Sequence, residues 1–157
     1  MYLPRYETRL QIVAAGEVTT ARTTHDDPES RRSWVSVRTG DVLLYCNEAD
    51  QISTRAHAWN SAAQKARQIG LPTISDVASA TGVVAQVTAG WRDTWDVTAV
   101  GASAARDGIP YVDVRAGSLM TRCYDTTALG RIRSVWLDAV QLGRLMWWRE
   151  RGYRTLA

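Results

Sequence analysis

The chain of 157 residues carries 19 basic and 16 acidic side chains, which gives a formal net charge of +3. Hydrophobic residues make up 45% of the composition and charged residues 22%, which is typical of a folded protein and excludes a low-complexity chain. The small basic excess permits an acidic partner such as nucleic acid without requiring one. Residues 1–7 contain no apolar run of the signal-peptide kind, and no stretch is long enough to span a membrane, so a cytoplasmic protein is expected.

The basic residues are almost all arginine. The sequence contains one lysine, at position 65, no phenylalanine and seven tryptophans. Arginine suits bidentate contacts with phosphate and stacking on aromatic rings. The same bias is also expected from GC-rich codons, which favours a bacterial source.

The first half of the sequence predicts four short strands followed by one long helix. The predicted strands are 10–14, 18–24, 34–38 and 42–46. The turn at 15–17 predicts a hairpin between the first two strands, and Gly40 predicts a tight turn between the last two. A polar loop at 25–32 separates the pairs. Asn47 or Asp50 is expected to cap the helix, which Gly70 and Pro72 end.

The second half repeats this order of elements. Strands are predicted at 83–89, 95–102, 111–115 and 119–123. A closing helix is predicted from Thr126 or Thr127 to the region of the C-terminus. Residues 73–82 form the expected linker, so the two units are predicted at 1–72 and 83–157.

An offset of 77 positions aligns the two halves. Seven pairs are identical over positions 34–63: Val35/Val112, Val37/Val114, Arg38/Arg115, Gly40/Gly117, Cys46/Cys123, Trp59/Trp136 and Ala62/Ala139. Identity at tryptophan and cysteine is rarely due to chance, so the pattern indicates an internal duplication. The early strands fit less well, and Val18-Thr19 aligns with Val97-Thr98 only if one loop is two residues shorter.

These patterns predict an α+β fold in which two ββββα repeats form one compact domain about a pseudo-twofold axis. Neither half has enough strands for a robust core of its own, so the repeats are expected to bury their sheets or helices against each other. In its order of elements the chain resembles the PUR-repeat and Whirly group of single-stranded nucleic-acid binders. That resemblance implies a sheet face as the binding surface.

Catalytic and metal-binding patterns are nearly absent, so a protein without enzymatic activity, cofactor or metal is expected. His25 and His57 have no partner at metal-ligand spacing. The acidic residues around Pro28 are typical of a solvated turn. Cys46 and Cys123 are expected to be buried structural thiols. A small enzyme or ligand-binding domain with a pocket at the repeat interface, where the two cysteines approach each other, is the third and least favoured hypothesis.

The third and fourth strands of each repeat carry a more suggestive pattern. Because side chains alternate along a strand, Val35 and Val37 face one way while Trp34 and Arg38 face the other. Aromatic rings with interleaved arginines are used by single-stranded nucleic-acid binders, which stack bases on the rings and neutralise phosphates. The predicted nucleic-acid-binding residues are Trp34, Arg38, Tyr45, Tyr111, Arg115 and Arg122.

Two alternatives remain open at this point. The aromatic face can instead pack against the other repeat, and Asp113 on the same face would repel phosphate. Alternatively, the chain is a regulator or assembly adaptor that binds a protein partner or a second copy through its tryptophan-rich C-terminal helix. The predicted interaction residues of that helix are Trp147, Trp148, Arg149 and Arg151. No membrane partner is expected.

Overall fold

A computed structural model describes residues 10–30, 32–76, 87–89, 97–102, 108–116 and 119–155. Within these ranges the chain has eight strands and two helices, which confirms a mixed α+β fold. The elements are β1 (Leu10–Ala14), β2 (Thr20–Asp27), β3 (Arg32–Thr39), β4 (Val42–Cys46), α1 (Ala49–Ile69), β5 (Val87–Ala89), β6 (Val97–Ala102), β7 (Tyr111–Ala116), β8 (Leu119–Cys123) and α2 (Thr126–Thr155).

The strands form two four-stranded sheets, and each sheet takes one strand from the other half of the chain. Sheet I has the order β2-β3-β4-β5, and sheet II has the order β1-β8-β7-β6. The exchanged strands are the parallel ones: β5 pairs with β4, and β1 pairs with β8. The predicted units 1–72 and 83–157 therefore do not correspond to separate sheets.

The predicted hairpin across residues 15–17 is wrong. β1 pairs with β8 and β2 pairs with β3, so the segment between them passes from one sheet to the other. Gly16 has a φ of 66°, and its N–H donates to Asp125 rather than closing a hairpin. The backbone N–H of Tyr124 donates to the carbonyl of Ala14 at 3.1 Å, which continues the parallel pairing at the end of β1.

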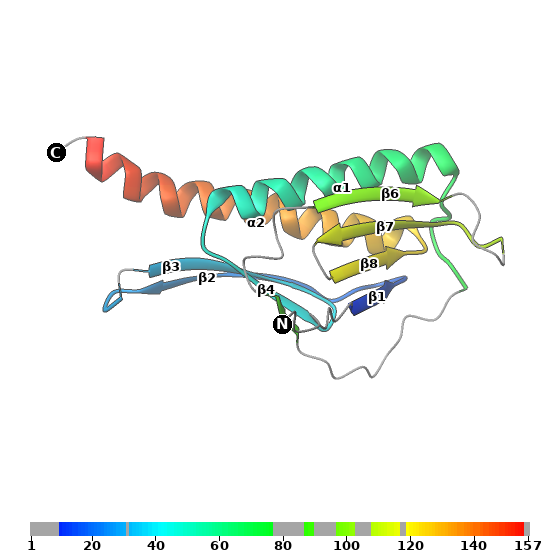
Figure 1. Cartoon of the computed structure of the whole chain (residues 1–157), viewed down its shortest axis with the longest axis horizontal. Helices are drawn as coiled ribbons and strands as arrows, with labels where there is room; N and C mark the ends of the chain where they lie inside the picture. The colour runs from blue at the N-terminus through cyan, green and yellow to red at the C-terminus, as the bar shows by residue number, and fades with distance from the viewer. Residues whose placement is uncertain are drawn as a thin grey trace, which may run out of the picture.

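The two helices lie side by side (Figure 1), and each packs mainly against the sheet that contains most strands of the other half of the chain. α1 packs against β6 and β7 of sheet II, whereas α2 packs against β2 and β3 of sheet I. The core between these layers includes Trp59 and Trp136, whose exposed fractions are 4% and 1%. The valines and cysteines that recur at the 77-residue offset are all buried in this core.

The strand pairings of the two sheets have matching registers. Thr20 pairs with Thr39, and 77 positions later Val97 pairs with Ala116. The exchanged strands follow the same rule, since Leu10 pairs with Leu119 and Val87 pairs with Val42. The two-residue gap expected before the third strand is therefore wrong, because the register continues through β2 and β6 without an insertion.

Some boundaries also differ from the predicted ones. β2 begins later than expected and continues through Asp27, so the expected loop at 25–32 is partly strand and His25 lies in the sheet. α1 begins after Glu48, which makes no side-chain capping hydrogen bond, rather than after Asn47 or Asp50. Gly70 ends α1 with a φ of 69°, as predicted for a left-handed C-cap.

Candidate nucleic-acid interface

Sheet I turns one face toward the helices and the other face outward. Val35 and Val37 have exposed fractions of 0%, which places them on the covered face. The strand registers put ten described side chains on the outer face: Ala21, Thr23, His25, Asp27, Arg32, Trp34, Ser36, Arg38, Leu43 and Tyr45. Asp27 is the acidic member of this set, and it lies opposite Arg32 at the end of β2.

Three rings gather at the centre of the outer face. His25 stacks on Trp34, with a distance of 5.3 Å between ring centroids and an angle of 13° between planes. The ring of Tyr45 lies 6.4 Å from that of His25 in a tilted arrangement. His25 Nε2 and Ser36 Oγ share a hydrogen bond of 3.0 Å, which fixes the imidazole orientation. We call His25, Trp34, Ser36 and Tyr45 the His25 cluster.

The His25 cluster presents apolar ring surface to solvent. Tyr45 is 42% exposed, an unusual value for a large ring on a central strand, and His25 and Trp34 are half-buried. The stack on Trp34 holds the imidazole nearly parallel to the indole. A planar ligand can therefore approach ordered rings without first ordering them.

Arg38 lies on the same face, next to the β3–β4 turn. Its side chain is exposed, and its Nε donates to the carbonyl of Gly40 at 3.1 Å. This bond engages one of the five N–H donors of the guanidinium. One hydrogen bond therefore holds the Arg38 side chain in place, while its other N–H groups can donate to a ligand.

The outer face of sheet II is chemically different. Arg122 donates from Nε and from a terminal nitrogen to the two carboxylate oxygens of Asp113, at 2.9 and 3.0 Å. The guanidinium carbon lies 3.8 Å from the centroid of Tyr111, and Tyr124 meets that ring edge-on at 6.2 Å. The hydrogen bond with Asp113 raises the pKa of Arg122. Charge and ring surface on this face are thus largely satisfied within the chain, apart from the exposed Arg115.

The predicted binding residues therefore fall into two groups. Trp34, Arg38 and Tyr45 lie on one open face, while Tyr111 and Arg122 interact with each other on another sheet. The sequence pattern does not place His25 at the site, because the polar segment 25–32 predicts a loop. No apolar–polar alternation marks this segment as a strand, because residues 22–27 are all polar.

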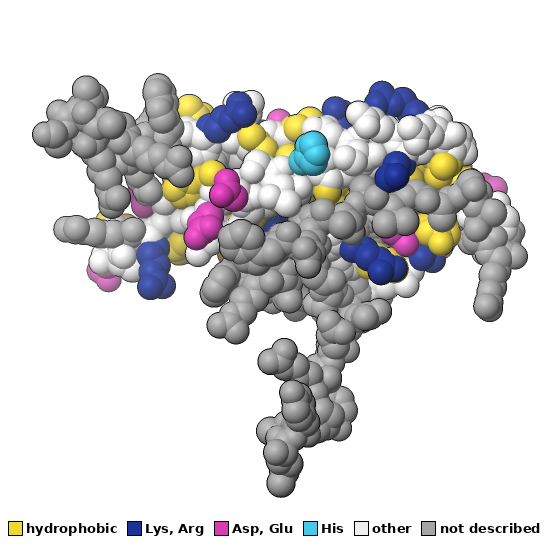
Figure 2. Space-filling model, turned by 45° about the horizontal axis from the view of Figure 1, so that its top comes forward, with side chains coloured by type: hydrophobic (Ala, Val, Ile, Leu, Met, Phe, Trp, Pro, Cys, Tyr) yellow, Lys and Arg dark blue, Asp and Glu magenta, His cyan; other side chains and the backbone are white. Residues whose placement is uncertain are grey.

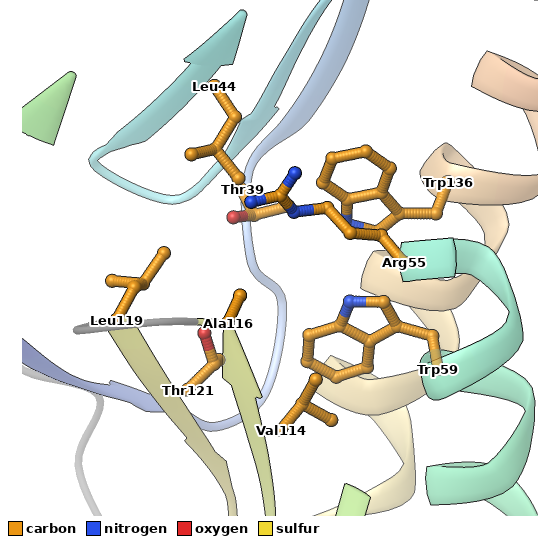
Figure 3. Close-up of a pocket in the computed structure, with 9 residues that line it drawn as sticks. All are labelled: Thr39, Leu44, Arg55, Trp59, Val114, Ala116, Leu119, Thr121 and Trp136. Carbon is orange, nitrogen blue, oxygen red and sulfur yellow. The ribbon is translucent and has the colours of Figure 1, made fainter. Parts of the chain in front are cut away.

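A buried arginine lies between the sheets and the helices. Arg55 on α1 has an exposed fraction of 2%, and its guanidinium carbon lies 5.5 Å from the ring centroid of Trp136. Figure 3 shows its side chain extending from α1 past Trp136 toward Thr39 and Leu44. The cavity lined by these residues has a volume of about 20 Å³, which is room for a single water molecule and too small for a metabolite.

The two cysteines are buried and do not line this cavity. Burial raises the pKa of Cys46 to about 11, although the neighbouring Arg55 partly opposes that effect. Burial also raises the pKa of Cys123, with Asp125 and Asp113 acting in the same direction. Both thiols are therefore protonated at neutral pH, and the thiolate that nucleophilic chemistry needs is scarce.

The described side chains on the helical side of the molecule form no comparable patch. Among the coloured side chains of Figure 2, lysine and arginine are spread over this side rather than gathered in one area. Trp147 is buried, with an exposed fraction of 9%, and packs over Gly143 close to Ile52. The side chains of Trp148, Arg149 and Arg151 lie outside the described residues.

Acidic and histidine side chains form no metal-binding group of three or more in the described part of the chain. Asp27 instead accepts hydrogen bonds from Ser30 Oγ at 2.6 Å and from the N–H of Glu29 at 3.1 Å, and these bonds lower its pKa. His57 is an exposed residue of α1. Neither helix, over its described residues, is apolar enough along its length to cross a membrane.

Comparison of the chain with family models, curated proteins and solved structures finds no match. The resemblance to PUR-repeat and Whirly proteins therefore stays a prediction from element order.

Proposed function

We propose that the chain binds single-stranded nucleic acid on the outer face of sheet I, without catalysing a reaction. The observation that carries the proposal is that the His25 cluster and Arg38 lie on one face, where the acidic Asp27 lies opposite the basic Arg32 at the end of β2. Unpaired bases stack on such rings whatever their sequence, and arginine neutralises the backbone. Tyr45 supplies the most exposed ring, and Arg38 supplies the phosphate contact.

We also infer that the chain arose by internal duplication and that its two ββββα units are related by a pseudo-twofold axis. The shared registers support this inference, because each of the three strand pairings of sheet II has the register of a strand pairing of sheet I after a shift of 77. The starts of the two helices, Ala49 and Thr126, are also 77 positions apart. Under this inference Arg115, Tyr111 and Arg122 form a second, altered copy of the proposed site.

Fluorescence anisotropy with labelled single-stranded DNA, single-stranded RNA and duplex DNA, at two salt concentrations, tests the proposal. We expect salt-sensitive binding that favours the single strands. Tyr45→Ala should cost about 1–3 kcal/mol of binding free energy if one base stacks on this ring. Arg38→Gln should weaken binding and reduce the salt dependence by about one phosphate contact.

Arg67→Gln is the matched control, because Arg67 is an exposed arginine in the last turn of α1 and its substitution changes the net charge equally. The proposal is overturned if no single strand binds at low salt. It is also overturned if Tyr45→Ala and Arg38→Gln bind as Arg67→Gln does. The double variant of Arg38 and Arg115 then measures whether the second sheet contributes.

A further inference from the structure

One edge of β2 has no partner strand among the residues that the structure describes. β2 has eight residues and is an edge strand of sheet I in the described part of the chain. Its register with β3 is continuous from Thr20 to Asp27, so no bulge turns the edge away. Proline and glycine are absent from the strand, and Ala21 to Thr24 are exposed. Such an edge presents unpaired backbone donors and acceptors to another strand.

We propose that β2 pairs in antiparallel orientation with β2 of a second copy of this chain. This inference does not rest on the proposed function. A closed dimer requires a two-fold axis, and the axis that relates two adjacent antiparallel strands runs perpendicular to the sheet. One residue then lies opposite its own copy, and its neighbours pair symmetrically around it.

Charge selects among the possible registers. Centring the axis on Arg22 places the two Arg22 side chains opposite each other, and centring it on Thr23 places Arg22 opposite Thr24. Centring it on Thr24 places Arg22 opposite Asp26 twice and keeps residues 21–27 paired. Directly opposite charges stabilise a cross-strand pair, while like charges destabilise it.

The side chains of this register are available. Arg22 is 45% exposed and lies 3.4 Å from Asp138 of α2, which places it on the helix-covered face. Asp26 lies on the same face, because it is four residues further along the strand, and it is exposed. Asp26 of the second copy would therefore join an existing, solvent-accessible ion pair rather than require a buried charge.

An exposed apolar side chain lies beside the same edge. Leu145 is 57% exposed and follows Asp138 by seven residues, so it lies on the same side of α2 as the residue that contacts Arg22. α2 runs above β2 and β3 (Figure 1). Pairing of the two edges would cover Leu145 in part and would join the two His25 clusters on one continuous outer face.

A concentration series by sedimentation velocity on the full chain tests the dimer. We expect a reversible dimer in the micromolar range, because pairing of one strand buries less than the about 1,200 Å² of a standard stable interface. Arg22→Asp and Asp26→Arg each create two like-charge pairs and should weaken dimerisation by roughly tenfold.

The decisive sample is an equimolar mixture of the two single variants. In the mixed dimer the introduced aspartate of one chain faces the introduced arginine of the other, and the remaining native Asp26 faces the remaining native Arg22. The mixture should therefore dimerise at concentrations where each variant alone stays monomeric. The double variant Arg22→Asp/Asp26→Arg should also dimerise. Circular dichroism of each variant verifies folding. A monomeric wild-type chain at all concentrations, or a dimer that neither single variant weakens, overturns the proposal.

Discussion

Equivalent positions of the two sheets carry different residues, and two differences decide how much charge each face offers. Ser36 lies opposite Tyr45 in sheet I, and 77 positions later Asp113 lies opposite Arg122 in sheet II. The serine hydroxyl orients His25, whereas the aspartate carboxylate binds Arg122 on both nitrogens. These two differences together separate an open aromatic face from one whose arginine is paired with a carboxylate.

Exchanging these two residues gives reciprocal expectations. Asp113→Ser should release Arg122, raise the affinity for single-stranded nucleic acid and increase its salt dependence by about one contact. Ser36→Asp should lower the affinity, because it adds a carboxylate beside Tyr45. Asp113→Ser also loses two charge-assisted hydrogen bonds, which should lower the free energy of unfolding by on the order of 1–3 kcal/mol. Anisotropy titrations measure the affinities. If the sheet II face has no role in binding, Asp113→Ser should bind single strands with the same affinity as the wild-type chain.

At the scale of the elements, Asp125 joins three segments at the start of α2. Its side chain is fully buried, and one carboxylate oxygen accepts the N–H of Ala128 at 2.8 Å. The other oxygen accepts the N–H groups of Gly16 at 2.7 Å and Ser75 at 3.2 Å. The carboxylate thus satisfies one N–H in the first turn of α2 and two loop donors, one between β1 and β2 and one after α1.

Asp125→Ala should be strongly destabilising. It removes a helix cap, worth about 1 kcal/mol, and leaves two further N–H groups without this acceptor at about 1–3 kcal/mol each. Glu48→Ala is the control, because Glu48 precedes α1 at the equivalent position and makes no side-chain capping bond. Urea unfolding should show a large decrease in midpoint for Asp125→Ala and little change for Glu48→Ala. Equal midpoints would mean that loop backbone or water replaces the carboxylate.

The elements themselves could be predicted well, and their partners could not. The bounds of β1, β4 and β8 match the predicted ones because short apolar runs between turn residues are local signals. The partner of β1 is β8, more than 100 positions away, and no local pattern encodes that pairing. A local pattern also fails to place His25 in a strand, because residues 24–27 (THDD) have the polar composition of a loop although they end the edge strand β2.

At the scale of the whole molecule, the exchanged strands make each half dependent on the other. Sheet I is completed by β5 and sheet II by β1, and each helix packs mainly on the sheet of the other half. The segment after α1 also reaches the start of α2, where the N–H of Thr126 donates to the carbonyl of Pro72 at 2.9 Å. The core is therefore shared, although its residues recur in the sequence as two separate sets.

Separating the halves tests this dependence. Residues 1–76 alone lack the strand that pairs with β1, and residues 77–157 alone lack the strand that pairs with β5. We expect neither half to unfold cooperatively as a monomer, because each exposes valines and a tryptophan that the other covers. An equimolar mixture refolded from urea should form a one-to-one complex with a cooperative transition. If either half folds alone as a monomer, the sheets can close within one half, and the strand exchange is then not required for folding.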